Sequence, residues 1–151
     1  MRVTKGGAAK FNEYSGRREL AAPDQLGIKA PVPSSWAFDE AVFAETMTLT
    51  AIVTVGGARQ SSGVLAAFVG TDVRGVQARP LLPPFGPHAG QPMFQLTLYG
   101  KDGEGFTFQF HRAGTTTPLD RVLSFATDGN AGNAMVPYVL AEKMSPSKLF
   151  A

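Results

Sequence analysis

Two histidines, His88 and His111, are the only residues of this 151-residue sequence that could supply an imidazole base. A nucleophilic triad needs such a base beside a hydroxyl or thiol, together with a third group that orients it. The sequence contains no cysteine and no Gly-x-Ser-x-Gly elbow, and His88 stands in a proline-rich stretch while His111 follows a run of alternating phenylalanines. We therefore interpret both histidines as surface residues and predict that the protein is not an enzyme.

Carboxylates occur in two loops whose composition suits a hard cation. Asp102 and Glu104 are separated by a glycine, and Asp128 is followed by a glycine and Asn130. Calcium takes about six to eight oxygen ligands from side chains and carbonyl groups of this kind. Neither loop has a full ligand set or the closing bidentate glutamate of a calcium loop. The sequence predicts no cofactor, and calcium at either loop is retained only as a minor alternative.

The basic charge of the sequence is concentrated in its first residues. Residues 1–20 hold five basic and two acidic residues, a net charge of +3 within a total of +2. A basic segment could contact nucleic acid or an anionic surface. These charges are sparse and nearly lack the interleaved aromatic residues that stack on bases. A solvated extended arm is the preferred interpretation, and nucleic acid is not an expected partner.

The composition suits one folded domain between two terminal segments. A chain of 151 residues that is 44% hydrophobic can bury a substantial core. It contains no run long enough to span a membrane, and its first residues lack the apolar centre of a secretory signal. We predict an extended, disordered basic arm over residues 1–35, a domain over residues 36–142 and a tail over residues 143–151.

Alternating apolar and polar residues predict β-strands in the central region. In residues 45–55 every second side chain is apolar and most of the others are threonines; residues 93–100 and 105–112 repeat the pattern, the latter with three phenylalanines. Residues 64–69 are almost continuously apolar, which predicts a strand covered on both faces. Trp36, the only tryptophan, is predicted to plug one end of the core.

Turn-forming residues separate these strands. Gly70-Thr71-Asp72 predicts a hairpin within residues 64–77, and Asp102-Gly103 predicts a second hairpin between residues 93–100 and 105–112. The five prolines of residues 79–92 exclude a central strand and predict a connection that crosses between sheets.

The remaining residues complete the predicted fold. Residues 113–118 and 128–133 are predicted as turn and loop, and residues 120–127 and 136–140 as further candidate strands. Strands at these spacings, without an amphipathic helix, predict an all-β fold, an antiparallel β-sandwich of six to eight strands.

Three phrases of the sequence resemble an Ig-like module that recurs in large secreted and cell-surface proteins of bacteria. They are SSWAFDEAVFAETMTLTAIVTVGG, GVLAAFVGTDVRGVQ and MFQLTLYGKDGEGFTFQFHRAG, within a resemblance that spans residues 34–140. The resemblance implies an extracellular or cell-surface sandwich without catalytic residues, which serves adhesion, spacing, or attachment to polysaccharide or to other chains. The module's Arg-Gly position corresponds to Arg74, which we interpret as a structural guanidinium that lies over a strand or caps a loop carbonyl.

A structural or assembly module is the first functional expectation. Extended arms can add a strand to the open sheet edge of a neighbour, so we expect the chain to pack against copies of itself or against a larger scaffold. A capsid, tail or filament subunit of a virus or phage is another form of this expectation. The candidate assembly contacts are Arg17, Arg18, Pro31, Pro33, Pro83, Pro84 and Phe85.

A carbohydrate-binding module is the alternative. Sugar-binding sandwiches present exposed aromatic rings beside polar side chains, and Tyr99 is out of phase with the apolar residues of its strand. The outward positions of the two strands that the second predicted hairpin joins would then form one flat face for a polysaccharide. Its residues are Gln95, Thr97, Tyr99, Thr107, Gln109 and His111.

Overall fold

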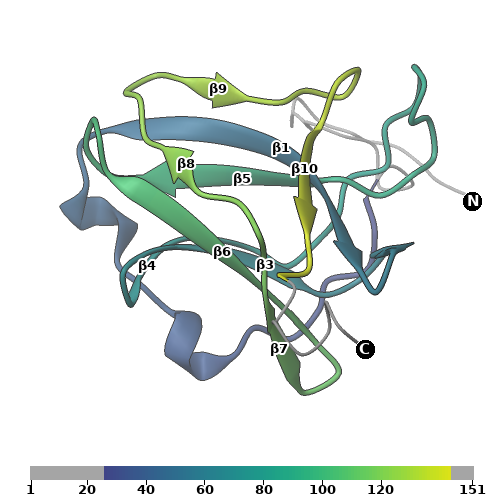
Figure 1. Cartoon of the computed structure of the whole chain (residues 1–151), viewed down its shortest axis with the longest axis horizontal. Helices are drawn as coiled ribbons and strands as arrows, with labels where there is room; N and C mark the ends of the chain where they lie inside the picture. Colours follow the sequence, from purple (N-terminus) through teal and green to yellow (C-terminus); the bar gives the residue numbers. More distant parts are fainter. Residues whose placement is uncertain (1–25, 144–151) are drawn as a thin grey trace, which may run out of the picture.

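Ten β-strands and two 3₁₀ helices are found in residues 26–143, the part of the chain that the computed structural model describes (Figure 1). The helices are η2 (Ser34–Trp36) and η3 (Glu40–Val42). The strands are β1 (Thr46–Val55), β2 (Ala58–Arg59), β3 (Val64–Val69), β4 (Asp72–Gln77), β5 (Phe94–Tyr99), β6 (Gly105–Arg112), β7 (Thr115–Pro118), β8 (Leu123–Ser124), β9 (Asn130–Ala131) and β10 (Tyr138–Ala141). The predicted all-β sandwich is confirmed, although the strands outnumber the six to eight expected because β2, β8 and β9 are two-residue pairings.

Two sheets form the sandwich. In the first sheet β1 pairs antiparallel with β2 and β5 and parallel with β9 and β10. The second sheet has the order β4-β3-β6-β7, and β8 also pairs with β6. The expectation of purely antiparallel pairing is wrong at β1. Residues 119–137 form a long connection rather than a tight hairpin, and such a connection lets β10 enter the edge of β1 in the same direction.

The second predicted hairpin is also wrong, although its turn exists. Glu104 N–H donates to Lys101 O at 3.1 Å, so residues 101–104 do reverse the chain. The strands on either side separate, however, because β5 pairs with β1 and β6 pairs with β3. An Asp-Gly turn fixes the local reversal, whereas the sheet that each strand joins depends on distant partners.

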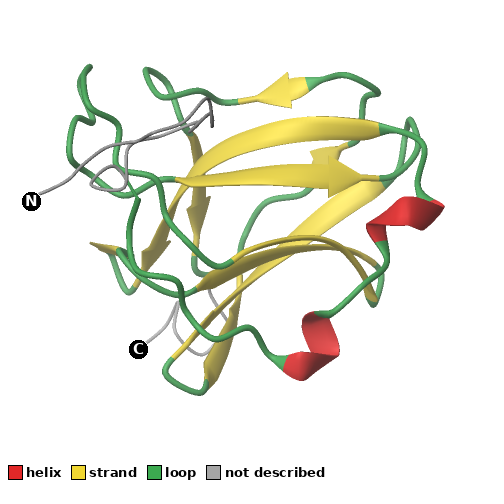
Figure 2. Cartoon of the chain, turned by 180° about the vertical axis from the view of Figure 1, so that it is seen from behind, coloured by secondary structure: helices red, strands yellow, loops and turns green. Residues whose placement is uncertain are grey.

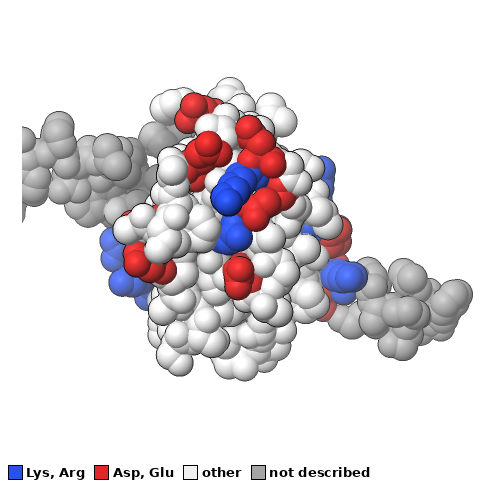
Figure 3. Space-filling view, turned by 90° about the vertical axis from the view of Figure 1, so that its left-hand side faces the viewer, with Lys and Arg blue, Asp and Glu red and all other residues white. Residues whose placement is uncertain are grey.

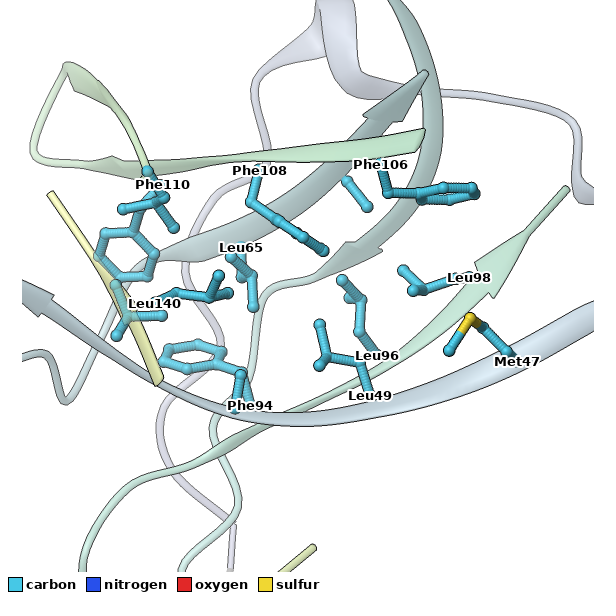
Figure 4. Close-up of a cluster of buried hydrophobic side chains, with 14 of the residues drawn as sticks. Met47, Leu49, Leu65, Phe94, Leu96, Leu98, Phe106, Phe108, Phe110 and Leu140 are labelled. Carbon is cyan, nitrogen blue, oxygen red and sulfur yellow. The ribbon is translucent and has the colours of Figure 1, made fainter. Parts of the chain in front are cut away.

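The alternating residues meet between the two sheets, as predicted. Phe106, Phe108 and Phe110 of β6 are 0%, 1% and 2% exposed. Figure 4 shows them facing side chains of β1 and β5. Burying each such ring contributes about 1.5–3 kcal/mol relative to exposure. The labelled members of this main core are Met47, Leu49, Leu65, Phe94, Leu96, Leu98, Phe106, Phe108, Phe110 and Leu140.

A second, smaller core lies on the outer face of the second sheet. Val64, Ala66 and Phe68 of β3 point away from the main core and are buried by Trp36 and neighbouring residues. The prediction that both faces of this strand are covered is therefore confirmed. Trp36 does not plug the end of the main core, because its ring packs on Phe68 with centroids 5.7 Å apart.

Residues 26–36, which we call the strap, supply this cover. Gly27 N–H donates to Pro80 O and Ala30 N–H donates to Ala78 O, so the strap runs along the continuation of β4. Helices η2 and η3 then carry the chain into β1 (Figure 2). Residues 26–35 were assigned to the disordered arm, but they pack on the sandwich. Residues 1–25 and 144–151, with most of the predicted arm and tail, lie outside the described residues.

Three smaller expectations are revised. Only Ala113 and Gly114 form the turn after β6, at φ values of 52° and 81°, and the β-branched run that follows pairs with β6 as β7. The candidate strand over residues 120–127 shortens to β8, and the predicted loop over residues 128–133 contains β9. In the described part of the chain, no helix has the length and hydrophobicity needed to cross a membrane.

Candidate functional site

Each histidine contacts another side chain of the fold. His111 Nδ1 lies 2.8 Å from Thr116 Oγ1, and the imidazole packs edge-on against Trp36. His88 Nδ1 lies 3.1 Å from Arg59 Nη1. A nucleophilic triad requires a hydroxyl beside the imidazole and a carboxylate that orients the imidazole. Neither arrangement within residues 26–143 shows both of these contacts. Both imidazoles serve to fix neighbouring chain segments.

The two carboxylates of the first candidate calcium loop are occupied by protein donors. Asp102 Oδ1 accepts the Thr127 N–H at 2.6 Å and the Thr127 hydroxyl at 2.9 Å. These hydrogen bonds lower the pKa of Asp102 below its usual value. Glu104 pairs with Arg74 and also accepts the Lys101 N–H at 2.8 Å. Its pKa is likewise lowered, chiefly by the hydrogen bond from Arg74.

The second candidate calcium loop is held together in the same way. Asp128 has a φ of 60° and donates its N–H to Thr46 O. Asn130 Oδ1 accepts the Thr48 hydroxyl, and its amide donates to Gly132 O. Among residues 26–143, no three His, Cys, Asp or Glu side chains converge as metal ligands would. The side-chain oxygens of Asp102, Glu104 and Asn130 serve the fold as hydrogen-bond acceptors.

Arg74 closes the seam between the two sheets, which confirms its structural interpretation. Its side chain reaches from β4 to the end of β5, where Nη1 donates to Tyr99 O at 3.3 Å. The guanidinium also lies 4.7 Å from the ring centroid of Phe43. Further along the seam, Gln77 Nε2 donates to Gln95 O at 2.8 Å. These side chains cover an edge of β5 that would otherwise present carbonyl groups to another strand.

The six residues predicted to bind polysaccharide do not form one face. Gln95, Thr97 and Tyr99 belong to the first sheet, and their counterparts on β6 belong to the second. Since both strands turn their apolar residues toward the shared core, their polar residues lie on opposite outer surfaces. Two of the six are also covered, because Phe38 and Phe43 pack on Tyr99 and Trp36 packs on His111. The other two predicted residues on β6 are Thr107 and Gln109.

An apolar cluster stands open where two loops meet, and we call it the loop corner. Phe85 from the proline-rich connection is 68% exposed, and Met135 and Val136 from the loop before β10 are 52% and 71% exposed. The loops touch, since a Cβ added to Gly86 would lie 2.8 Å from Met135 Sδ. Asn133 Oδ1 accepts both the Met135 and the Val136 N–H at 2.8 Å. Exposed apolar groups gathered in this way often mark interaction sites.

Arg59 anchors the proline-rich side of the loop corner. Its Nε donates to Pro92 O at 3.0 Å, and its Nη1 donates to Gln91 Oε1 at 2.8 Å and contacts His88. Burial lowers the pKa of Arg59 below its usual value. A second turn is closed where Gly90 N–H donates to Pro83 O. These hydrogen bonds therefore hold the proline-rich side of the loop corner in place.

The predicted assembly contacts fall in different environments. Pro84 and Phe85 are exposed at the loop corner, whereas Pro83 is buried beneath them. Pro31 is exposed on the strap and Pro33 is half-buried. Arg17 and Arg18 lie outside the described residues.

Sequence reasoning did not identify Arg59, Met135 or Val136, although two large apolar residues in a Gly- and Asn-rich loop were a usable signal.

Comparison with known proteins adds no assignment. No protein-family model, no curated protein and no solved structure matches this chain.

Proposed function

We propose that this chain is a non-enzymatic, Ig-like structural module that assembles with copies of itself or with a larger scaffold at the cell surface or outside the cell. The loop corner is the observation that carries the proposal. It exposes Phe85, Met135 and Val136 together on a base that Arg59 holds in place. A rigid apolar cluster gains more from association than a mobile one, because less conformational entropy is lost on binding.

The point where the described domain begins supports a role for the N-terminal segment in assembly. Leu26 forms a β-bridge with Leu81, and Leu81 forms another with Met93. The described domain thus begins beside the proline-rich connection that carries the loop corner. A contact made by that segment and a contact made by the corner could serve the same partner.

The charged side chains of the described domain support a structural rather than a catalytic role. Arg74, Asp102 and Glu104 make hydrogen bonds within the fold, and the histidines contact chain segments that they hold in place.

The first test is the molar mass of the full chain in solution, measured by light scattering across a range of concentrations. We expect a mass above that of the 16.0 kDa monomer, and a shift toward the monomer in the variant Val136→Thr. Val122→Thr is the matched control, because Val122 is 68% exposed but lies beside Gly105 at the start of β6. A wild-type chain that stays monomeric at all concentrations would count against self-assembly.

The scaffold form of the proposal has its own test. Removal of residues 1–25 leaves the strap in place, so the domain should keep its fold by circular dichroism while its association weakens. A cut at residue 34 would be uninformative, because it removes part of the cover over Val64 and Phe68. Unchanged association after the shorter cut would assign assembly to the described domain alone.

A further inference from the structure

The described domain carries opposite charges at its two ends. Figure 3 shows acidic side chains gathered around a small basic cluster at the end where β1 and β6 begin. Residues 26–143 hold nine acidic and eight basic residues. Seven of the acidic residues and two of the basic ones, Arg74 and Lys101, lie at this end, which gives it a net charge of −5. The seven are Asp39, Glu40, Glu45, Asp72, Asp102, Glu104 and Asp128.

The opposite end is basic. It holds five basic and two acidic residues, a net charge of +3, around the ends of β1, β4 and β6, while Arg121 lies between the two ends against Tyr138 and Val139. The five basic residues are Lys29, Arg59, Arg79, Arg112 and Lys143, and the acidic ones are Asp120 and Glu142. The described domain is therefore strongly bipolar, although its nine acidic and eight basic residues nearly cancel in number.

The two ends do not neutralise each other in solution. The eight residues of β6 run from one end to the other, a path of about 26 Å at about 3.3 Å per residue. Charges are screened over about 8 Å at physiological ionic strength. Each end thus presents its own charge to an approaching molecule.

A groove at the basic end has the chemistry to receive an acidic segment. It has a volume of about 390 Å³ and lies between the strap and the turn from β6 to β7. Ile28, Ala30 and Pro31 give it an apolar wall, and the basic residues Lys29 and Arg112 also line it, together with His111. Among residues 26–143, no acidic residue lines this groove. An occupant should therefore combine an apolar side chain with carboxylates.

The η3 segment at the acidic end matches that description. Asp39, Glu40, Ala41 and Val42 are all exposed, and Val42 has 70% of its surface open to solvent. Asp39 accepts the Ala41 N–H at 3.0 Å, which fixes this short turn so that the carboxylates and the valine project together. The segment offers one apolar side chain beside two carboxylates, which are groups that none of the described residues lining the groove carries.

We propose that copies of this chain associate head to tail, with the η3 segment of one copy in the strap groove of the next. The proposal rests on the proposed assembly function and gives it a partner and a geometry. Because the two surfaces are different, each added copy exposes a new groove or a new η3 segment. Such a heterologous contact builds a ring if its rotation closes and a filament if it does not.

Charge reversal on the full chain tests this arrangement. Both Lys29 and Glu40 are exposed, and Glu40 hydrogen-bonds the Tyr99 hydroxyl. Lys29→Glu and Glu40→Lys should therefore each fold, and each should lose the oligomer at a concentration where the wild type forms it. Equimolar mixing of these two variants should restore pairs, because the two reversed charges then face each other. In a separate measurement, 1 M salt should weaken the association of the wild type. Lys143→Glu is the control, since it makes the same charge change outside the groove and should keep the oligomer.

A second pair of variants tests the apolar part of the contact. Val42→Thr should weaken association, while Val122→Thr, at a site of almost equal exposure, should not. One outcome would overturn the head-to-tail contact and leave the proposed function standing. In that outcome the wild type associates, and Lys29→Glu, Glu40→Lys and Val42→Thr associate equally well. Val136→Thr, in contrast, does not associate. A wild-type chain that is monomeric at every concentration overturns both self-assembly and the head-to-tail contact.

Discussion

Arg74 and Glu104 form a two-pronged ion pair across the seam between the sheets. Nη1 of Arg74 lies 2.8 Å from Oε1 of Glu104, and Nη2 lies 3.2 Å from Oε2. The arginine is 9% exposed as a whole residue, and its Nε has no hydrogen-bond partner within the described part of the chain. One residue thus ties β4 to the end of β5 and to the first residues that lead into β6.

Replacing this guanidinium should loosen the seam. Arg74→Lys keeps the charge but cannot make two parallel hydrogen bonds, and its ammonium cannot also reach Tyr99 O. We expect a loss of about 2 kcal/mol in the free energy of unfolding, measured by urea denaturation. Arg79→Lys is the control, since Arg79 is exposed beyond the seam. Equal stability of the two variants would show that the seam does not depend on the bidentate pair.

Acid should destabilise the domain through Glu104 and Asp102. Both have a pKa lowered in the folded state, so between the lowered and the ordinary values the unfolded chain binds more protons. Their contribution is complete above the ordinary carboxyl pKa of about 4 and is lost as the pH falls through the folded values. Unfolding free energies measured from pH 6 to pH 2 should fall less steeply in Glu104→Gln. Asp72→Asn, at the exposed first residue of β4, is the matched control for the removal of one carboxylate.

A methyl group at Gly75 should force the two sheets apart. An added Cβ would lie 2.6 Å from the carbonyl oxygen of Thr97, and a backbone atom cannot swing aside. We expect Gly75→Ala to cost about 1–3 kcal/mol by urea denaturation. Gly105→Ala is the matched control, because its Cβ would meet Val122 at an ordinary 3.5 Å. A cost in the control equal to that at Gly75 would locate the effect in the backbone rather than in the seam.

Truncation of Trp36 should release the strap from the second sheet. Trp36 is 7% exposed and packs on Phe68 and His111, so Trp36→Ala should cost about 3 kcal/mol. Amide exchange should then accelerate at Ala30, which the strap bonds to Ala78, before it does in the main core. Trp36→Phe keeps part of the packing and should lose less. Uniform acceleration across β1 and β6 would show that the two cores unfold together.

The alternation of residues by itself determined most of the interior. Phe106, Phe108 and Phe110 had to face one side of a strand because successive side chains point to opposite faces. The unbroken apolar run of β3 required cover on both of its faces, and the prolines of residues 79–92 excluded a central strand. These are local constraints, and each can be read from a few neighbouring residues.

Tertiary structure alone decided which strands became neighbours. The Asp102-Gly103 turn suits a hairpin and a corner between sheets equally well, so the placement of β5 and β6 in different sheets depended on long-range pairing with β1 and β3. That choice divided the predicted polysaccharide face. It also brought Arg74 to Glu104 and Gly86 to Met135, across 30 and 49 positions of the sequence. Such contacts arise only when segments distant in the chain share one core, which no local period of the sequence encodes.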